Sequence, residues 1–169
     1  MLLMKNVPKR EVIEAFAKRM PGLDPSAVEA CLVLLRTASD IFDAMDAHFS
    51  RYGISQGRFA VLMTLKKAQS ELLTPAQIAE RIGVTRATIT GLVDGLFKDG
   101  LVERKPHEKD RRKLNITLTG KGQKFLKDML PDHFRRIAGL MKSTQKKERY
   151  ELIDLLSKVE EGIAELREP

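Results

Sequence analysis

The chain has 169 residues, which is enough for one domain or for a small domain with appended helices. Its formal net charge of +7 indicates an anionic partner such as nucleic acid. The single cysteine excludes an internal disulfide, and the first residues lack the apolar core of a signal peptide, so we expect a cytoplasmic protein that does not span a membrane.

The first third of the chain is predicted to be helical. A short amphipathic helix is expected over residues 8–20, where apolar residues recur at helical spacing. Asp24 can cap a long second helix that ends near Tyr52, and Ser55 can cap a third helix over residues 56–67. The long helix carries more apolar surface than a small domain can bury on one side.

Two short helices with a tight turn between them are expected next. Thr74 and Gln77 have the spacing of a capping box at the start of the first helix. Gly83 can supply the positive φ of a turn between helices, and Thr85 can cap the second helix. This pattern is typical of a helix-turn-helix.

A β-hairpin is predicted to follow. Gly100 ends the second helix, and strands are expected over residues 101–105 and 115–118, around a tip at residues 106–113. The stretch from residue 98 to residue 113 holds seven Lys and Arg against four Asp and Glu, so positive charge is concentrated there. Helices and hairpin together predict a winged helix-turn-helix.

The second helix of this motif is predicted to enter a DNA major groove. Small, hydroxylated or cationic side chains suit the donors, acceptors and thymine methyls of that groove. The predicted contact residues are Thr85, Arg86, Ala87, Thr88, Thr90 and Gly91. Gly91 and Gly95 each cost the helix about 1 kcal/mol relative to alanine, which predicts close approach of the DNA backbone or of a neighbouring helix.

The wing carries cations that suit a narrow, negative minor groove. These are Lys105, Lys109, Arg111, Arg112 and Lys113. Asp110 is two residues before Arg112, where its carboxylate could hold the guanidinium in an extended pose.

The last part of the chain is predicted to form two helices. Thr119 can cap the first, which runs to Met141 with a kink before Pro131, because the apolar spacing continues across the proline. The second covers residues 145–166, and its apolar stripe has no partner inside one winged domain, so two chains are expected to pack their first and last helices together. The expected division is residues 1–53, 54–118 and 119–169. The predicted fold is mainly α-helical with a small β-hairpin wing and long N- and C-terminal dimerisation helices.

These segments resemble the DNA-binding core of the MarR family of bacterial and archaeal transcriptional regulators. The matching stretches are IAERIGVTRATITGLVDGL, LVERK, DRR in the wing, and LTGKG at the start of the next helix. The resemblance implies that Arg112 enters the minor groove and that Asp110 orients it. It also implies a homodimer on a pseudo-palindromic double-stranded DNA operator, acting as a repressor that an effector releases.

The family often binds small aromatic or phenolic effectors in a crevice between the dimerisation helices and the winged domain. The candidate residues here are Met45, His48, Phe49, Phe59 and Met63. An aromatic and methionine stripe at helical spacing is also what a plain hydrophobic core contains, so that alternative stays open.

Cys31 lies where the peroxide-sensing branch of the family keeps a reactive cysteine. That branch surrounds the thiol with tyrosine hydroxyls, whereas this chain has Leu35 and Met45 nearby. We therefore expect a buried, inert thiol, with peroxide sensing as the alternative.

Other classes of site find little support. The three histidines, His48, His107 and His133, lack metal-ligand spacing, and the stretch from Gly120 to Phe125 lacks the third glycine of a dinucleotide fingerprint. Since there is neither a nucleophile–base pattern nor a paired-carboxylate pattern, we expect no enzyme activity and no cofactor. A winged-helix interaction module without operator function is the competing class.

Overall fold

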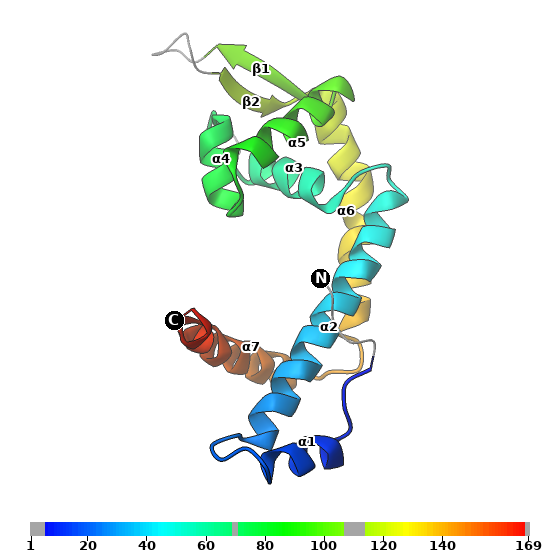
Figure 1. Cartoon of the computed structure of the whole chain (residues 1–169). Coiled ribbons are helices and arrows are strands. Elements are labelled where there is room, and N and C mark those ends of the chain that lie inside the picture. The colour runs from blue at the N-terminus through cyan, green and yellow to red at the C-terminus, as the bar shows by residue number, and fades with distance from the viewer. Residues whose placement is uncertain (1–5, 69–70, 107–113, 168–169) are drawn as a thin grey trace. The chain divides into compact units, whose positions relative to one another are not determined.

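The computed structural model describes residues 6–68, 71–106 and 114–167. The chain divides into two compact units, Met1–Thr119 and Gly120–Pro169. It is mainly helical with a two-stranded antiparallel hairpin, as Figure 1 shows, so the predicted fold class is confirmed. No helix in the described ranges is long and apolar enough to cross a membrane. The boundary between the units lies next to one of the expected boundaries; the three-part division itself stays a prediction.

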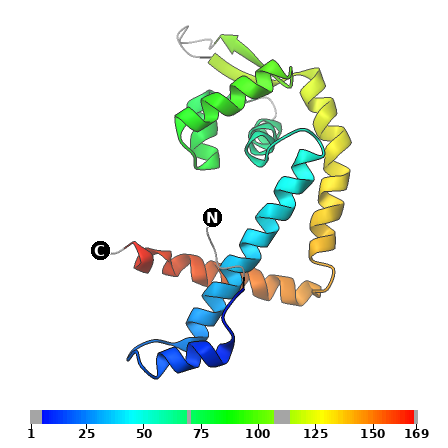
Figure 2. The same ribbon diagram turned by 45° about the vertical axis from the view of Figure 1, so that its right-hand side comes forward.

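The first unit begins with a helical hairpin of α1 (Arg10–Ala17) and α2 (Pro25–Ser50). Helix α1 is shorter than expected, and Figure 2 shows it beside the start of α2. Ile13 is buried in this contact, and Arg10 Nε donates to Glu29 Oε2 over 2.8 Å. Asp24 caps α2 as predicted. The hydroxyl and the backbone N–H of Ser26 donate hydrogen bonds to the Asp24 carboxyl group and lower its pKa.

The winged part of the first unit packs α3 (Gln56–Ala68), α4 (Pro75–Ile82), α5 (Arg86–Lys98) and the hairpin around an aliphatic core. Each helix turns one face inward, as the apolar spacing requires. The buried apolar residues of these elements and their connections are Val61, Leu62, Leu65, Leu73, Ile78, Ala79, Ile89, Val93, Leu96, Leu101, Val102 and Ile116.

Local hydrogen bonds fix where α4 and α5 begin. The Thr74 Oγ1 atom accepts from Gln77 N over 3.4 Å, and Thr74 N donates to Gln77 Oε1 over 2.9 Å, so the predicted capping box is confirmed. Gly83 ends α4 with φ of 77°, a conformation that favours glycine. Thr85 caps α5 through a 3.2 Å hydrogen bond from Thr88 N. The turn between the two helices is therefore specified by residues within it.

The wing consists of β1 (Val102–Pro106) and β2 (Leu114–Leu118), paired antiparallel with Val102 opposite Leu118. Ile116 N donates to Leu73 O over 2.8 Å, which ties the residue before the α4 cap to the inner strand. Strand β1 begins and ends one residue later than predicted, and β2 begins one residue earlier than predicted. The wing is thereby fixed to the helix-turn-helix at its base.

The second unit contains α6 (Gly120–Leu140), α7 (Lys146–Glu161) and the 3₁₀ helix η1 (Gly162–Leu166). Pro131 lies inside α6, so the prediction of one helix across the proline is confirmed; the kink stays a prediction. The predicted last helix is α-helical only to Glu161 and continues as η1.

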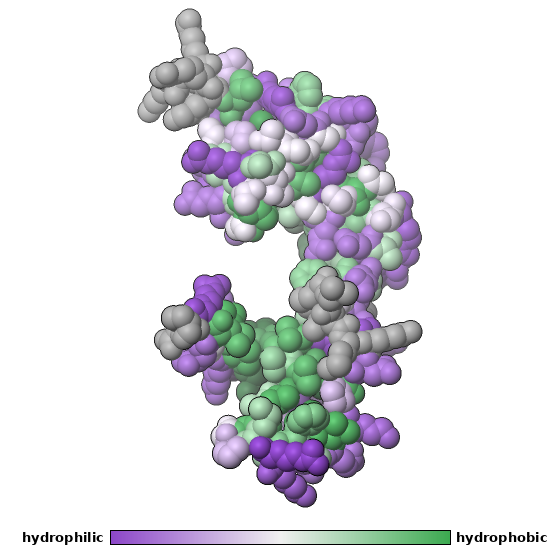
Figure 3. All heavy atoms as spheres, viewed as in Figure 1, coloured by the Kyte–Doolittle hydropathy of each residue, from purple (hydrophilic) through white to green (hydrophobic). Residues whose placement is uncertain are grey.

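Apolar side chains remain exposed on the helices predicted to dimerise. No residue of α7 is buried in the described chain. Its exposed apolar residues are Tyr150, Leu152, Ile153, Leu155, Leu156 and Val159, and α2 exposes Val33, Leu35 and Phe42. Figure 3 shows such apolar surface on the face in view. A single chain therefore leaves apolar surface uncovered in each unit.

Candidate nucleic-acid interface

Helix α5 presents the predicted contact residues to solvent. Its buried face consists of Ile89, Val93 and Leu96, which anchor it in the core. The other face is exposed at every predicted position, namely Thr85, Arg86, Ala87, Thr88, Thr90 and Gly91. The structure thus brings these six residues together at the start of one exposed helix, although a role in DNA contact stays a prediction.

The threonine hydroxyls of this face are already engaged with the helix. Thr85 Oγ1 and Thr88 Oγ1 are 2.9 Å apart and share a hydrogen bond. Thr90 Oγ1 donates to the backbone oxygen of Arg86 over 3.0 Å. The Thr90 hydrogen bond uses its one hydroxyl proton, so its oxygen lone pairs and methyl group are what it can offer to a base edge.

Arg86 differs from the other arginines that the structure describes in the winged part. Arg58, Arg81 and Arg104 each form an ion pair, with Asp99, Glu71 and Asp94 respectively. The exposed Arg86 side chain has no ion pair or hydrogen bond with the residues that the structure describes. It therefore carries an uncompensated positive charge at the outer end of the helix, suited to a phosphate or to a guanine edge.

The two glycines of α5 have different surroundings. A Cβ atom on Gly91 would meet nothing within 4 Å, so this position opens to solvent and leaves room for a DNA backbone. A Cβ atom on Gly95 would lie 2.8 Å from Cζ and Nε of Arg58, and closer still to Nη2. Gly95 thus fits the alternative of close approach by a neighbouring helix, because Arg58 belongs to α3.

At the base of the wing, the charge of Lys105 is partly balanced. Lys105 Nζ lies 2.8 Å from Glu103 Oε1, which also accepts from Thr117 Oγ1 over 3.1 Å. These two hydrogen bonds lower the pKa of the Glu103 carboxyl group. Lys105 is exposed and can still contact a phosphate. The predicted residues at the tip, Asp110, Arg111, Arg112 and Lys113, lie outside the described residues, as does Lys109.

Sequence reasoning missed the arginine that joins the wing to α5. Arg104 on β1 forms an ion pair with Asp94, and its guanidinium lies over the ring of Phe97, 4.9 Å from the centroid. These contacts bind the first strand of the wing to the helix that carries the contact residues. The pair is ten residues apart and crosses two elements, so no helical or strand spacing signals it.

The predicted effector residues are only partly brought together. The rings of His48, Phe49, Tyr52 and Phe59 form an aromatic cluster at the α2–α3 corner, with Phe49 and Phe59 centroids 4.6 Å apart. His48 and Phe49 are buried, and His48 Nδ1 lies 3.2 Å from an Arg51 nitrogen. Met45 and Met63 are partly exposed, and Met63 lines a pocket of about 430 Å³ with Thr64, Lys66 and Lys67. Effector binding here stays a prediction.

The expectation that Cys31 is buried is wrong for the single chain. Its side chain is exposed on α2. The neighbouring apolar positions had suggested burial, but α2 is a long helix whose amino-terminal half keeps much of its circumference in solvent, and Cys31 lies on that side.

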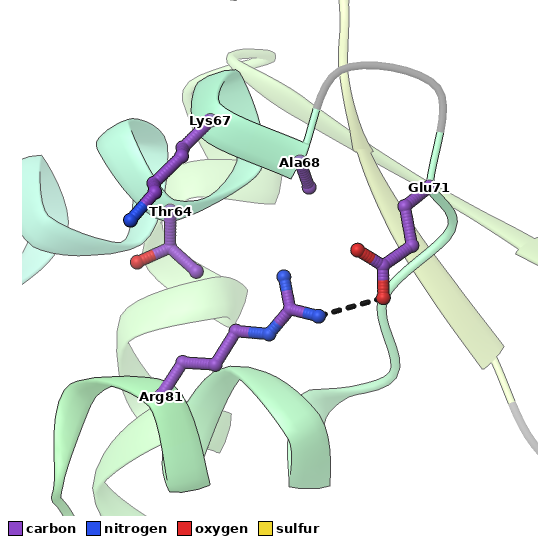
Figure 4. Close-up of a pocket in the computed structure, with 5 residues that line it drawn as sticks. All are labelled: Thr64, Lys67, Ala68, Glu71 and Arg81. Carbon is purple, nitrogen blue, oxygen red and sulfur yellow. Dashed lines mark hydrogen bonds and ion pairs between the residues drawn. The ribbon is translucent and has the colours of Figure 1, made fainter.

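A pocket that the sequence did not suggest opens in the winged part. It has a volume of about 560 Å³ and is lined by Thr64, Lys67, Ala68, Glu71 and Arg81. Figure 4 shows Arg81 directed at Glu71, with Nη2 and Oε1 2.6 Å apart. This ion pair satisfies Arg81 within the protein, and Thr64 and Lys67 are the other polar residues of the lining.

Comparison with known proteins agrees with this geometry. The sequence matches the MarR family over residues 54–114. It is 35% identical to the HTH-type transcriptional repressor YetL of Bacillus subtilis over 161 residues, covering 95% of this chain and 96% of that protein. It is 27% identical to the HTH-type transcriptional regulator PecS of Dickeya dadantii, over 93% of this chain and 95% of that protein.

Solved structures share the fold. The structure of the S. aureus MepR–DNA complex matches with a TM-score of 0.69 and 20% identity, over 79% of this chain and 95% of that chain. At this identity the match shows the winged fold, and the family rests on the sequence matches. The chain belongs to the MarR family of transcriptional regulators.

Proposed function

We propose that the protein is a homodimeric repressor that binds a double-stranded DNA operator in the cytoplasm. The observation that carries this proposal is the exposed face of α5, where the uncompensated Arg86 stands among small and hydroxylated residues. Such a face fits a major groove, and the wing beside it can reach a flanking minor groove. The name of YetL, a repressor, supports repression as the outcome.

The exposed apolar side chains of α2 and α7 support a homodimer. Burying such side chains against a second chain removes apolar area from water, at about 25 cal/mol for each Å². A two-fold symmetric dimer would place two copies of α5 on the same side of the DNA. We therefore expect a pseudo-palindromic operator with half-site centres about 34–36 Å apart, one helical turn of DNA.

An effector would release the operator by a shift between existing conformations. A small aromatic or phenolic anion that binds better to one arrangement of the α2–α3 corner favours that arrangement. The aromatic cluster at this corner lies in the same unit as α5. The candidate effector residues therefore stand where a change in packing can reach the DNA-contacting helix.

Duplex binding at several salt concentrations tests the proposal against the competing interaction module. A regulator that neutralises phosphates with its basic residues should lose affinity steeply as the salt concentration rises. The logarithm of the binding constant should fall against the logarithm of the salt concentration with a slope of about −0.9 for each phosphate contacted. It should also prefer one duplex over a scrambled duplex of the same length. A shallow slope without sequence preference would instead support the interaction module.

The exposure of Cys31 favours one second candidate, a peroxide-sensing regulator. In such a protein a hydroperoxide would oxidise the thiolate to a sulfenic acid and be reduced to an alcohol. Treatment with an organic hydroperoxide should then abolish operator binding by the wild type and spare the Cys31→Ser variant. Equal binding by both proteins before and after treatment would exclude this candidate.

A further inference from the structure

Arg58 lies across the helix that carries the predicted base contacts, although it is not one of those contacts. It belongs to the first turn of α3, where its backbone N–H donates to Ser55 Oγ over 3.3 Å. Its guanidinium reaches α5, and Nη1 lies 3.0 Å from Asp99 Oδ2. The Arg58 side chain is 24% exposed and the Asp99 side chain is 46% exposed, so this ion pair is only partly shielded from solvent.

Gly95 provides the space in which this guanidinium lies. A Cβ atom at Gly95 would overlap the Cζ and Nε atoms of Arg58, each 2.8 Å away. The obstructing atoms are the far end of a flexible side chain, so a methyl group there would displace Arg58 rather than the backbone. The glycine thus keeps a groove open across α5 for one arginine.

The ion pair also compensates an unfavourable charge. Asp99 is the residue at the carboxyl end of α5, where the helix dipole disfavours a negative side chain. The Arg58 guanidinium brings a positive charge to the same end, which favours the contact. Arg58 thereby holds the end of α5 opposite to the end that carries Arg86.

The two helices approach closely at a second point. A Cβ atom at Gly57 would lie 3.2 Å from the Cδ atoms of Leu92, so α3 and α5 are in near contact at neighbouring positions. A shift of the first turn of α3 therefore cannot leave α5 unaffected. On the other side of this turn, the Phe59 ring packs on Phe49 of α2.

We propose that Arg58 is a positioning residue of the DNA interface, which sets the angle of α5 through its contacts with Gly95 and Asp99. This positioning role rests on the proposed function, because the angle of α5 matters only if that helix reads an operator. Arg58 is next to Phe59 of the aromatic cluster in the sequence and contacts α5, so a repacking of that cluster would reach α5 through the same turn of α3.

The competing role for Arg58 is a direct phosphate contact, and substitutions separate the two. The variants are Arg58→Ala, Arg58→Lys, Asp99→Asn, Gly95→Ala and the double variant Arg58→Ala with Gly95→Ala. Dissociation constants are measured for a selected operator and for a scrambled duplex of equal length, and sedimentation confirms the oligomeric state.

If Arg58 positions α5, Arg58→Ala should weaken operator binding by roughly tenfold and scrambled-duplex binding much less. Asp99→Asn and Gly95→Ala should each reproduce this loss of preference, and the double variant should be no worse than Arg58→Ala. Arg58→Lys should keep only part of the preference for the operator over the scrambled duplex, because an ammonium group lacks the planar shape that fits over Gly95.

Urea unfolding of the same variants tests the contact itself without DNA. In the Arg58→Ala background, Gly95→Ala should raise the unfolding midpoint, because alanine favours a helix over glycine and the three atoms nearest to that Cβ, all of Arg58, are gone. In the wild-type background that gain should be reduced or reversed. Gly139→Ala in α6, where a Cβ atom meets nothing within 4 Å, is the matched control and should act equally in both backgrounds.

Three results would overturn the proposal. Equal losses on both duplexes for Arg58→Ala, with Asp99→Asn binding more tightly, would show a phosphate contact. A lower unfolding midpoint with an unchanged operator preference would show a purely structural role. A wild type without any duplex preference would remove the proposed function and the positioning role with it, while the unfolding comparison would still decide whether Arg58 and Gly95 interact.

Discussion

Among the arginines that the structure describes in the winged part, Arg58, Arg81 and Arg104 are paired and Arg86 is not. Arg104 of the wing pairs with Asp94 of α5, and Arg58 of α3 pairs with Asp99, the residue that caps the carboxyl end of α5. Because these charges are satisfied within the protein, they hold α5 rather than attract DNA. Arg86 is the cation that the first turn of α5 offers to a partner.

Arg86→Ala should therefore weaken operator binding by about 1–3 kcal/mol without destabilising the fold. Fluorescence anisotropy with a labelled operator measures the affinity. Arg36→Ala is the matched control, because Arg36 lies on α2 and is paired with Asp40. This variant should bind the operator as tightly as the wild type does. An unchanged affinity for Arg86→Ala would contradict its assignment to the interface.

Thr88→Ala should change which sequences are preferred more than it changes non-specific affinity. The substitution removes the hydroxyl that pairs with Thr85 but keeps the Thr88 N–H hydrogen bond that caps α5. The helix should thus stay in place while one methyl and one hydroxyl leave the groove-facing surface. Competition between operator variants measures the preference, and an equal loss on every duplex would refute this role.

At the scale of elements, short-range signals predicted the structure well. The capping box of Thr74 and the cap of Thr85 are confirmed, because each depends on residues three positions apart. The bounds of α1 and of the last helix were less accurate, since helix ends are also set by packing. Such packing involves partners that are distant in the sequence.

Contacts between elements were the part that the sequence did not reveal. The ion pair of Arg58 with Asp99 joins α3 to α5 across many residues, and no spacing rule predicts it. The exposure of Cys31 was mispredicted for a related reason, because the side of a long helix that faces solvent depends on what packs against it. The composition of the α5 face could be predicted; the residues that orient it could not.

Thr85→Ala should destabilise the protein by about 1 kcal/mol, because the backbone N–H of Thr88 loses its acceptor at the start of α5. Thr85→Ser keeps the hydroxyl and should retain most of the stability. Urea unfolding followed by circular dichroism measures both. Equal midpoints for the alanine variant and the wild type would mean that the cap does not stabilise α5.

At the scale of the whole molecule, the exposed apolar side chains of α7 are the feature that a single chain does not explain. Leu156 is 40% exposed, and its neighbours along the helix are exposed as well. The oligomeric state is thus the property on which the proposed symmetric DNA binding depends.

Leu156→Asp should dissociate the dimer or unfold the protein, because it places a charge in a surface that we expect to be buried. Analytical ultracentrifugation detects dissociation and circular dichroism detects unfolding. Ser157→Asp introduces the same group at the adjacent exposed position, on a different side of the helix from Leu152, Leu155, Leu156 and Val159, and should leave the dimer intact. An undisturbed, folded Leu156→Asp dimer would show that the interface lies elsewhere.

Selection of duplexes from a random DNA library, with the wild type and Arg112→Ala in parallel, tests whether the protein reads an operator. The wild type should enrich a pseudo-palindrome with half-sites one helical turn apart, and Arg112→Ala should lose or blur the enrichment because the wing no longer reads the minor groove. No enrichment by the wild type at moderate salt would rule out sequence-specific operator binding.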